Sequence, residues 1–267
     1  MSFSLASAVR PLGDGTYTAT LPPEWTIGPK PHGGFLLALA ARAAVASACA
    51  ASGIAELDPL AVSAQFLRAP EVGPVLVRTE VRKVGRTATV VNASIEQRGR
   101  SCVEVAVTVG RLPSGGVSYA DLPDLPAVPP ADAIDLATLG PAGVYKLGAV
   151  CEVRLSPHTA GFLTGRTTDP LVLDLWVKPL AERPDPYFAL MTGDISMPVT
   201  FNLGRFGWSP TVQLTALLRA APAPGWLRTR FSARAVHGQW FDEDAVVIDS
   251  TGTLICQARQ LALTPVA

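Results

Sequence analysis

Short segments of the first half of the chain recur in the same order in the second half. The matching segments are FLRAP at 66–70 and LLRAAP at 217–222, VRT at 77–79 and LRT at 227–229, and the turn glycines Gly99 and Gly252. Segments that recur in order at a nearly constant separation indicate a duplicated structural unit. The repeat therefore restricts the chain to folds in which one unit occurs twice.

A proline-rich segment separates the two copies. Six prolines lie between Pro113 and Gly143, and this segment has neither helical nor strand periodicity. Proline at this density favours an extended connector. We therefore predict an N-terminal unit over 1–112, a linker over 113–143 and a C-terminal unit over 144–267.

The first copy combines one apolar helix with several strands. Residues 35–51, FLLALAARAAVASACAA, place apolar side chains at helical spacing, and Gly53 ends the pattern. Apolar and polar residues alternate over 77–83, 91–96 and 103–109, with a turn at 97–100, and such alternation predicts antiparallel strands with one buried face. Both elements are buried when the sheet wraps around the helix. We expect an α+β fold with two tandem units, each a long helix wrapped by a curved antiparallel sheet.

The composition narrows the class of protein. Hydrophobic residues make up 48% of the chain and charged residues only 16%, which excludes intrinsic disorder and a coiled coil. The 22 basic residues balance the 22 acidic ones, so the charge expected of a nucleic-acid-binding protein is missing. We expect small molecules, or other copies of the chain in a homo-oligomer, as partners.

The cysteines and histidines predict no metal site. The four cysteines lie far apart without a C-x-x-C pair, and the three histidines are scattered. The N-terminus has no basic segment followed by a long apolar one, which argues against a secretory signal. The apolar segment at 34–51 is interrupted by Arg42 and is too short to span a bilayer. These features predict a cytoplasmic protein without a membrane partner.

A carboxylate stands out in the apolar segment that follows residue 185. Asp194 is the only charged residue between Asp185 and Arg205. At helical spacing it lies one turn beyond Leu190, on the apolar face. A buried carboxylate costs several kcal/mol unless it is hydrogen-bonded or protonated. The alternative is that Gly193 ends the helix and leaves Asp194 at the surface.

Two polar residues near the C-terminus have similarly ambiguous patterns. Gln260 is the polar exception on a strand face that otherwise carries small or apolar residues, unless the strand ends before it. Thr211 alternates with Gln213 and Thr215 onto one face, so it is either a site residue or an ordinary strand residue. Both side chains can position a water molecule.

Four local patterns together resemble one family. They are PHGGFLLAL at 31–39, GDISMPV at 193–199, SPT at 209–211 and GTLICQARQ at 252–260. In this order and spacing they resemble the acyl-CoA thioesterase II family. The resemblance covers nearly the whole chain and implies a double hotdog fold, hydrolysis of acyl-CoA to free acid and CoA, and a role in fatty acid metabolism. Gln213 and Leu214 depart from the acidic and His residues of the family pattern.

The resemblance also implies where the site lies. It implies catalytic roles for Asp194, Thr211 and Gln260, and it matches the glycine-bearing helix start of the family to Gly33 and Gly34. An Asp can deprotonate or orient a water molecule, a hydroxyl and an amide can position it, and backbone N–H groups at a helix start can polarise the thioester carbonyl. Such chemistry needs no cofactor. His32 either contacts the ligand or caps the helix.

Two other functions stay open at this point. One is a hotdog hydratase or dehydratase that acts on acyl-CoA, and the other is a non-catalytic protein that binds an acyl group or CoA. Hydratase chemistry needs an Asp and a His that converge, and the helix predicted in the second copy contains no His. The chain has no G-x-S-x-G motif, which argues against an α/β-hydrolase. The fold alone does not separate these functions.

Overall fold

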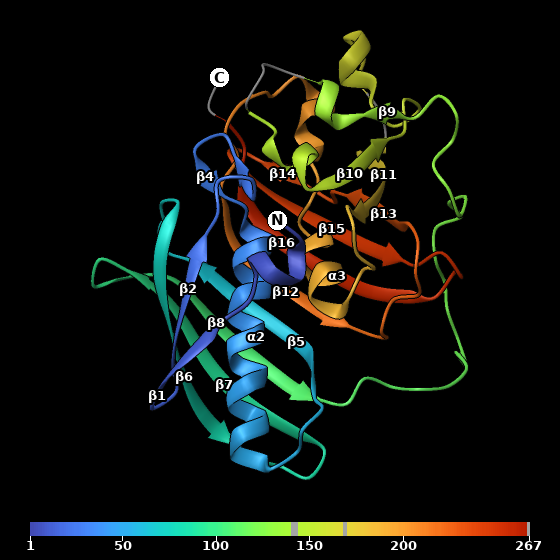
Figure 1. The fold of residues 1–267 in the computed structure, drawn as a ribbon. Coiled ribbons are helices and arrows are strands. Elements are labelled where there is room, and N and C mark those ends of the chain that lie inside the picture. Colours follow the sequence, from blue (N-terminus) through green and yellow to red (C-terminus); the bar gives the residue numbers. More distant parts are fainter. Residues whose placement is uncertain (140–143, 168–169, 266–267) are drawn as a thin grey trace.

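Strands from both halves of the chain join in one curved antiparallel sheet (Figure 1). The computed structural model describes residues 1–139, 144–167 and 170–265, and within these residues the sheet has 14 strands. From edge to edge they are β1 (Arg10–Gly13), β2 (Thr16–Leu21), β6 (Gly73–Lys83), β7 (Ala88–Gln97), β8 (Arg100–Gly110), β5 (Asp58–Phe66), β12 (Thr211–Leu218), β16 (Leu254–Leu263), β15 (Trp240–Ile248), β13 (Leu227–Ser232), β11 (Val172–Pro179), β10 (Cys151–Leu155) and β9 (Ile134–Asp135). The short β14 (Val236–His237) pairs with β15, and β3 (Thr26–Ile27) pairs with β4 (Lys30–Pro31) in a separate ribbon.

The strand order is symmetric about the junction of β5 and β12. At this junction Ser63 lies opposite Thr215, 152 positions later in the chain, and their hydroxyl oxygens are 2.9 Å apart. Outward from it, β8 corresponds to β16, β7 to β15, β6 to β13, β2 to β11 and β1 to β10. The two halves therefore have the same topology, as the sequence repeat predicts, and a pseudo-twofold axis passes through the centre of the sheet.

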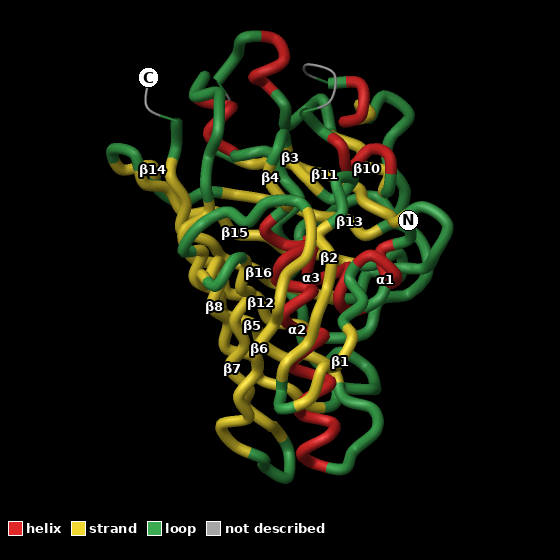
Figure 2. Tube along the Cα trace, turned by 60° about the vertical axis from the view of Figure 1, so that its left-hand side comes forward, coloured by secondary structure: helices red, strands yellow, loops and turns green. Residues whose placement is uncertain are grey.

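Helix α2 (Gly33–Ser52) fills the concave side of the first half. In Figure 2 the strands of this half curve around it, with β7 and β8 on one side and β1 on the other. Its core positions are mostly alanines and leucines that are fully buried, and small side chains let the sheet approach closely. Gly53 ends the helix in the left-handed region with φ of 70°. By length and hydropathy α2 alone among the described helices is able to span a membrane, and 72% of its apolar segment is buried inside the protein.

The helix of the second half is shorter than expected. Asp185 caps α3 (Pro186–Thr192), which has seven residues, and Gly193 ends it. Pro198 lies five residues further on and is the residue just before the next helical turn. The chain continues instead as the 3-10 helix η4 (Val199–Leu203). The prediction of a long helix in both units therefore holds for the first unit and is corrected for the second.

The proline-rich segment runs along the outside of the protein from β8 towards β9 (Figure 1). Residues 111–133 form neither helix nor strand, and the Leu125 and Pro126 carbonyls accept hydrogen bonds from Arg228 and Trp176 of the second half at 2.5 and 2.8 Å. The last part of the predicted linker is not an extended connector. It contains β9, which pairs with β10, and the 3-10 helix η1 (Leu136–Thr138). Positions 140–143 lie outside the described residues. The unit boundaries stay a prediction.

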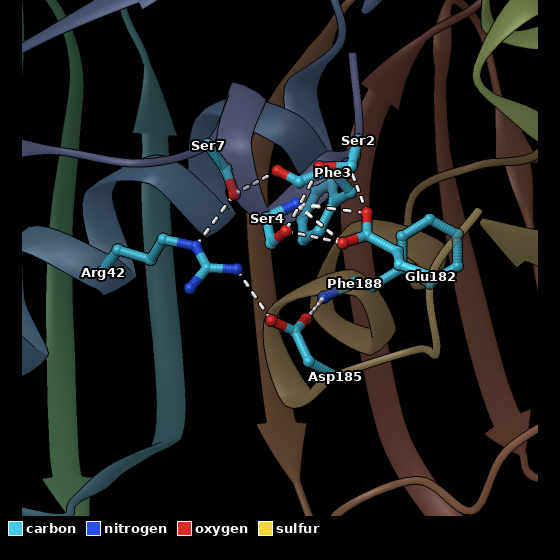
Figure 3. Close-up of polar contacts among 8 residues, drawn as sticks. All are labelled: Ser2, Phe3, Ser4, Ser7, Arg42, Glu182, Asp185 and Phe188. Atoms are coloured by element: carbon cyan, nitrogen blue, oxygen red, sulfur yellow. Dashed lines mark hydrogen bonds and ion pairs between the residues drawn. The ribbon is translucent and has the colours of Figure 1, made fainter. Parts of the chain in front are cut away.

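The N-terminal helix α1 (Phe3–Ala6) links the two halves (Figure 3). The Glu182 carboxylate accepts hydrogen bonds from the Phe3 amide and from the Ser4 hydroxyl, the latter at 2.6 Å. Arg42 of α2 donates to the Ser7 hydroxyl at 2.8 Å and to the Asp185 carboxylate at 2.7 Å. Arg42 thus connects the helix of the first half to the N-terminus of the helix of the second.

We expect the substitution Arg42→Met to lower the free energy of unfolding by about 1–3 kcal/mol, because it leaves a partly buried carboxylate without its cation. The matched control is Arg259→Met, which removes a more exposed arginine paired with Asp244 and should cost less than about 1 kcal/mol. Urea unfolding of both variants measures the difference. Equal losses would show that Arg42 does not link the halves energetically.

Candidate active site

Asp194 lies at the N-terminus of α2, although it belongs to the other half of the chain. It follows the end of α3 by two residues, so it does not lie in the helix as predicted. It is also not a surface residue: its side chain is partly buried, and its Oδ2 accepts a hydrogen bond of 2.6 Å from the Gly34 amide. The helix ends at Gly193, as the surface alternative expected. The Asp194 side chain nevertheless turns inward, as the alternative with a buried carboxylate expected.

Glycine is required at both positions that begin α2. A Cβ atom on Gly33 would lie 2.7 Å from the Asp194 Oδ2, and one on Gly34 would lie 2.7 Å from the Met191 carbonyl oxygen. Both distances are shorter than a Cβ contact allows. The paired glycines predicted for the site thus lie where the segment around Asp194 packs directly against the start of α2.

The first amide groups of α2 have different partners. The Gly34 N–H donates to Asp194, and the Phe35 N–H donates to the His32 Nδ1 at 3.3 Å. Among the residues that the structure describes, the Gly33 N–H donates to none. An unpaired amide at a helix N-terminus attracts a negatively charged or polarised oxygen.

His32 caps α2, which is the second of the two roles considered for it. The side chain is 6% exposed, and burial lowers its pKa to about 4, although a hydrogen bond to the Asp194 backbone opposes this shift. The imidazole is therefore neutral at physiological pH, and its Nδ1 accepts the hydrogen bond that caps the helix. Contact between His32 and a substrate stays a prediction.

Thr211 and Gln260 form a hydrogen-bonded pair on the core face of the sheet. The Thr211 hydroxyl donates to the Gln260 Oε1, and Gln260 is 9% exposed. Gln260 is thus the inward polar exception that the strand pattern suggested. Thr211 reaches the same face because the pairing of β12 with β16 shifts between Thr211 and Gln213, and such a bulge reverses the alternation of side chains.

A second carboxylate, which the sequence analysis missed, extends this pair. Glu243 of β15 lies opposite Gln260 in the pairing of β15 with β16 and is 2% exposed. Its Oε1 accepts hydrogen bonds from the Gln260 Nε2 at 2.9 Å and from the Ser196 hydroxyl at 2.7 Å. The sequence did contain a signal for this residue, because Glu243 is a carboxylate on the otherwise apolar face of its strand. Because Ser196 follows Asp194 closely in the chain, Glu243 connects the Asp194 segment to the Thr211–Gln260 pair.

Burial raises the pKa of Asp194 to about 7, and the nearby charge of Glu243 acts in the same direction. The hydrogen bond from Gly34 opposes both effects because it stabilises the ionised form. A carboxylate with a pKa near neutrality accepts a proton more readily than an ordinary Asp does. The site thus contains a potential base beside a helix N-terminus.

The pseudo-twofold counterpart of this contact has different chemistry. There α2 meets the N-terminus of α3 through the ion pair between Arg42 and Asp185, and Asp185 also caps α3 by accepting from the Phe188 amide at 2.6 Å. A cation takes the place that Asp194 holds in the first contact. The start of α2 therefore receives a carboxylate from the other half of the chain, whereas the start of α3 is capped by its own Asp185 and receives a guanidinium from the other half.

Profiles of one protein family match both halves of the chain. Residues 21–110 match the acyl-CoA thioesterase N-terminal domain, and residues 120–264 match the acyl-CoA thioesterase C-terminal domain. The chain belongs to the acyl-CoA thioesterase family. It is therefore a thioester hydrolase with a double hotdog fold, as its resemblance to the acyl-CoA thioesterase II family implied.

Relatives and solved structures agree with this assignment. An uncharacterized protein of Mycobacterium tuberculosis is 40% identical over 288 residues, which cover 98% of each chain. A putative thioesterase II from Thermobifida fusca has a TM-score of 0.86 at 30% identity and covers 99% of this thioesterase and 97% of its own chain. The acyl-CoA thioesterase II TesB2 of Mycobacterium marinum has a TM-score of 0.73 at 15% identity over 100% and 98% of the two chains, which shows the shared fold.

The substitution Asp194→Asn is expected to stabilise the folded protein at neutral and alkaline pH. A carboxyl whose pKa is raised on folding contributes stability below its unfolded pKa, and this contribution is lost as the pH rises towards about 7. Asn keeps the shape of the acid without the charge. The melting temperature of the variant should exceed that of the parent by at least about 3 °C at about pH 8, and the gap should narrow towards about pH 4.

Asp244→Asn serves as the control, because this carboxylate lies on the outer face of β15 and pairs with Arg259. It should give no such increase. A melting temperature of Asp194→Asn below that of the parent at alkaline pH would contradict the assigned cost of burying this charge.

Proposed function

We propose that this thioesterase hydrolyses acyl-CoA through a water molecule that Asp194 activates and that Thr211 and Gln260 position. The observation that carries the proposal is the contact of the Asp194 Oδ2 with the first turn of α2, next to the Gly33 amide. A carboxylate beside a helix-start amide that has no partner among the described residues supports the pairing of a base with an oxyanion donor. A cytoplasmic location and assembly into homo-oligomers stay predictions from the sequence.

Asp194 supplies the base in this mechanism. Its Oδ2 is held by Gly34, whereas its Oδ1 hydrogen-bonds to none of the described residues and is able to accept a proton from water. The raised pKa of about 7 matches this task at neutral pH. As the proton moves to Asp194, the water oxygen forms a bond to the thioester carbonyl carbon.

The start of α2 stabilises the oxyanion that this attack creates. The Gly33 N–H and the positive end of the helix dipole favour negative charge at this point. When the tetrahedral intermediate collapses, the carbon–sulfur bond breaks and the sulfur leaves with the bonding electron pair. The proton held by Asp194 passes to the CoA thiolate, which regenerates the carboxylate.

Thr211 and Gln260 orient the water before attack. The Thr211 hydroxyl donates its hydrogen to the Gln260 Oε1, so the remaining lone pairs of the Thr211 oxygen accept from water. A water molecule that donates to both Asp194 and Thr211 keeps a lone pair for the carbonyl carbon. This arrangement reduces the orientational freedom that would otherwise oppose the reaction.

A dehydratase would need a His close to Asp194, and the structure shows which His residues lie there. The helix of the second half contains no His, but His32 of the first half lies beside the Asp194 backbone. Its Nδ1 is used to cap α2 through the Phe35 amide, however, and the residue is buried. His158 and His237 are exposed, so neither supplies the missing acid or base. The arrangement favours hydrolysis.

Release of CoA from a chain-length series of acyl-CoA thioesters tests the proposal. Asp194→Asn should lower kcat/KM at least about 100-fold, and Thr211→Val and Gln260→Ala about 10- to 100-fold, because each removes a group that activates or orients water. The matched controls Thr215→Val and Gln257→Ala alter the outer faces of the same strands, β12 and β16, and should keep the parental rate within about twofold.

An Asp194→Asn variant with the parental rate would contradict the assigned base. Hydration of an enoyl-CoA without release of CoA would support the dehydratase alternative instead. Tight binding of acyl-CoA without turnover by the parent would support a binding protein.

A further inference from the structure

Glu243 and Asp249 are the two most buried carboxylates among the described residues, each 2% exposed, and the proposed hydrolysis does not use Glu243 directly. It occupies the core face of β15 between Phe241 and Ala245, both of which are nearly fully buried. An apolar side chain would suit this position better, because burying a carboxylate costs several kcal/mol unless hydrogen bonds offset the cost. The charge at this position therefore needs an explanation.

The contacts of Glu243 point towards the site. Its Oε2 accepts a hydrogen bond of 2.9 Å from the Val199 amide, and its Oε1 accepts from the Ser196 hydroxyl and from the Gln260 side chain. Ser196 and Val199 belong to the segment that follows Asp194. No other described group accepts from the Gln260 Nε2.

An ionised carboxylate can accept hydrogen bonds but cannot donate them. The Glu243 carboxylate therefore fixes the orientation of the Gln260 side-chain amide. A Gln side chain has an amino end and a carbonyl end of nearly equal shape, so its orientation follows from its partners. Glu243 selects the orientation in which the amino end faces it. The carbonyl end, Oε1, then points to Thr211 and accepts the hydroxyl hydrogen.

We propose that Glu243 is a positioning residue for hydrolysis, which holds the Gln260 amide in the orientation that directs the Thr211 hydroxyl hydrogen away from the attacking water. The proposal rests on the proposed function of Thr211 and Gln260. It adds a residue from a third strand to the site and assigns it a role that acts through Gln260.

The opposite orientation of Gln260 would impair attack. With its amino end towards Thr211, Gln260 would donate to the Thr211 oxygen, and the hydroxyl hydrogen would point towards the water. The water would then accept from Thr211 through one of its two lone pairs, which lowers the nucleophilicity of its oxygen and removes Thr211 as the acceptor that orients it. Loss of Glu243 should therefore slow the chemical step and leave the binding of acyl-CoA nearly unchanged.

The pKa shifts of Glu243 and Asp194 agree with the proposed positioning role of Glu243. Burial raises the pKa of Glu243 to about 7, and the hydrogen bonds from Val199, Ser196 and Gln260 oppose this rise. The charge of Glu243 also raises the pKa of Asp194. Glu243 thus interacts with both parts of the site, and assays at about pH 8 keep it mostly ionised.

The variant Glu243→Gln tests the proposal, since it keeps the shape of the side chain and lets Gln260 adopt either orientation. We expect kcat to fall about 10- to 100-fold while KM stays within about threefold. The double variant Glu243→Gln/Gln260→Ala should be no slower than Gln260→Ala alone within about twofold, because the two residues act as one unit. Additive losses in the double variant would overturn the proposal.

Asp174→Asn is the matched control. Asp174 is another buried carboxylate of the same sheet, and it pairs with Arg230 on β13. This variant should lower the melting temperature and leave kcat unchanged. If Glu243→Gln does not fold, Glu243→Asp provides the same test, because its shorter side chain keeps the charge and withdraws it from Gln260.

A measurement without turnover separates this proposal from the proposed function. In a ¹⁵N-resolved NMR spectrum, the Gln260 side-chain amide, assigned by its loss in Gln260→Ala, should change its shift and exchange faster with water in Glu243→Gln. An unchanged signal would overturn the proposal even in an active enzyme. A parental protein that hydrolyses no acyl-CoA would refute the proposed function, and the catalytic role of Glu243 with it, whatever the amide signal shows.

Discussion

One hydrogen bond between the two halves of the chain determines the rest of the site. The Asp194 carboxylate of the second half accepts from the Gly34 amide at the start of the buried helix of the first half. The contact is possible only where both residues at the helix start lack a side chain. It places an acid with a raised pKa against the positive end of a helix, so the proposed base and the proposed oxyanion donor lie together.

Duplication created two such positions, and they have diverged. The pseudo-twofold axis relates the contact of Asp194 with α2 to the contact of Arg42 with α3. In the second position an ion pair joins the halves, and the N-terminal helix α1 covers it through Glu182 and Phe3. The contact of Asp194 with α2 thus belongs to the proposed active site, whereas the contact of Arg42 with Asp185 stabilises the fold. This division agrees with the proposed site, whose catalytic groups come mainly from the second half of the sequence.

The elements with strong periodicity were predictable, because their patterns depend only on burial. The long helix α2, the strands β6 to β8 and the inward Gln260 all follow from local alternation. Three features depend on contacts that local patterns do not record. The bulge before Gln213 turns Thr211 inward, and His32 meets Asp194 only after folding. The buried Glu243 is explained by hydrogen bonds from Gln260, Ser196 and Val199, which form only when β15 packs against these segments.

The most direct measurement is a crystal structure of Asp194→Asn with an intact acyl-CoA bound. The account predicts the thioester carbonyl oxygen within about 3 Å of the Gly33 amide nitrogen, and the carbonyl carbon within reach of a water molecule held by the substituted side chain. The alternative location is the open groove of about 570 Å³ on the outer face of the sheet, which Ser63, Gln65 and Asn92 line. A thioester bound in that groove would contradict a site built between the two halves.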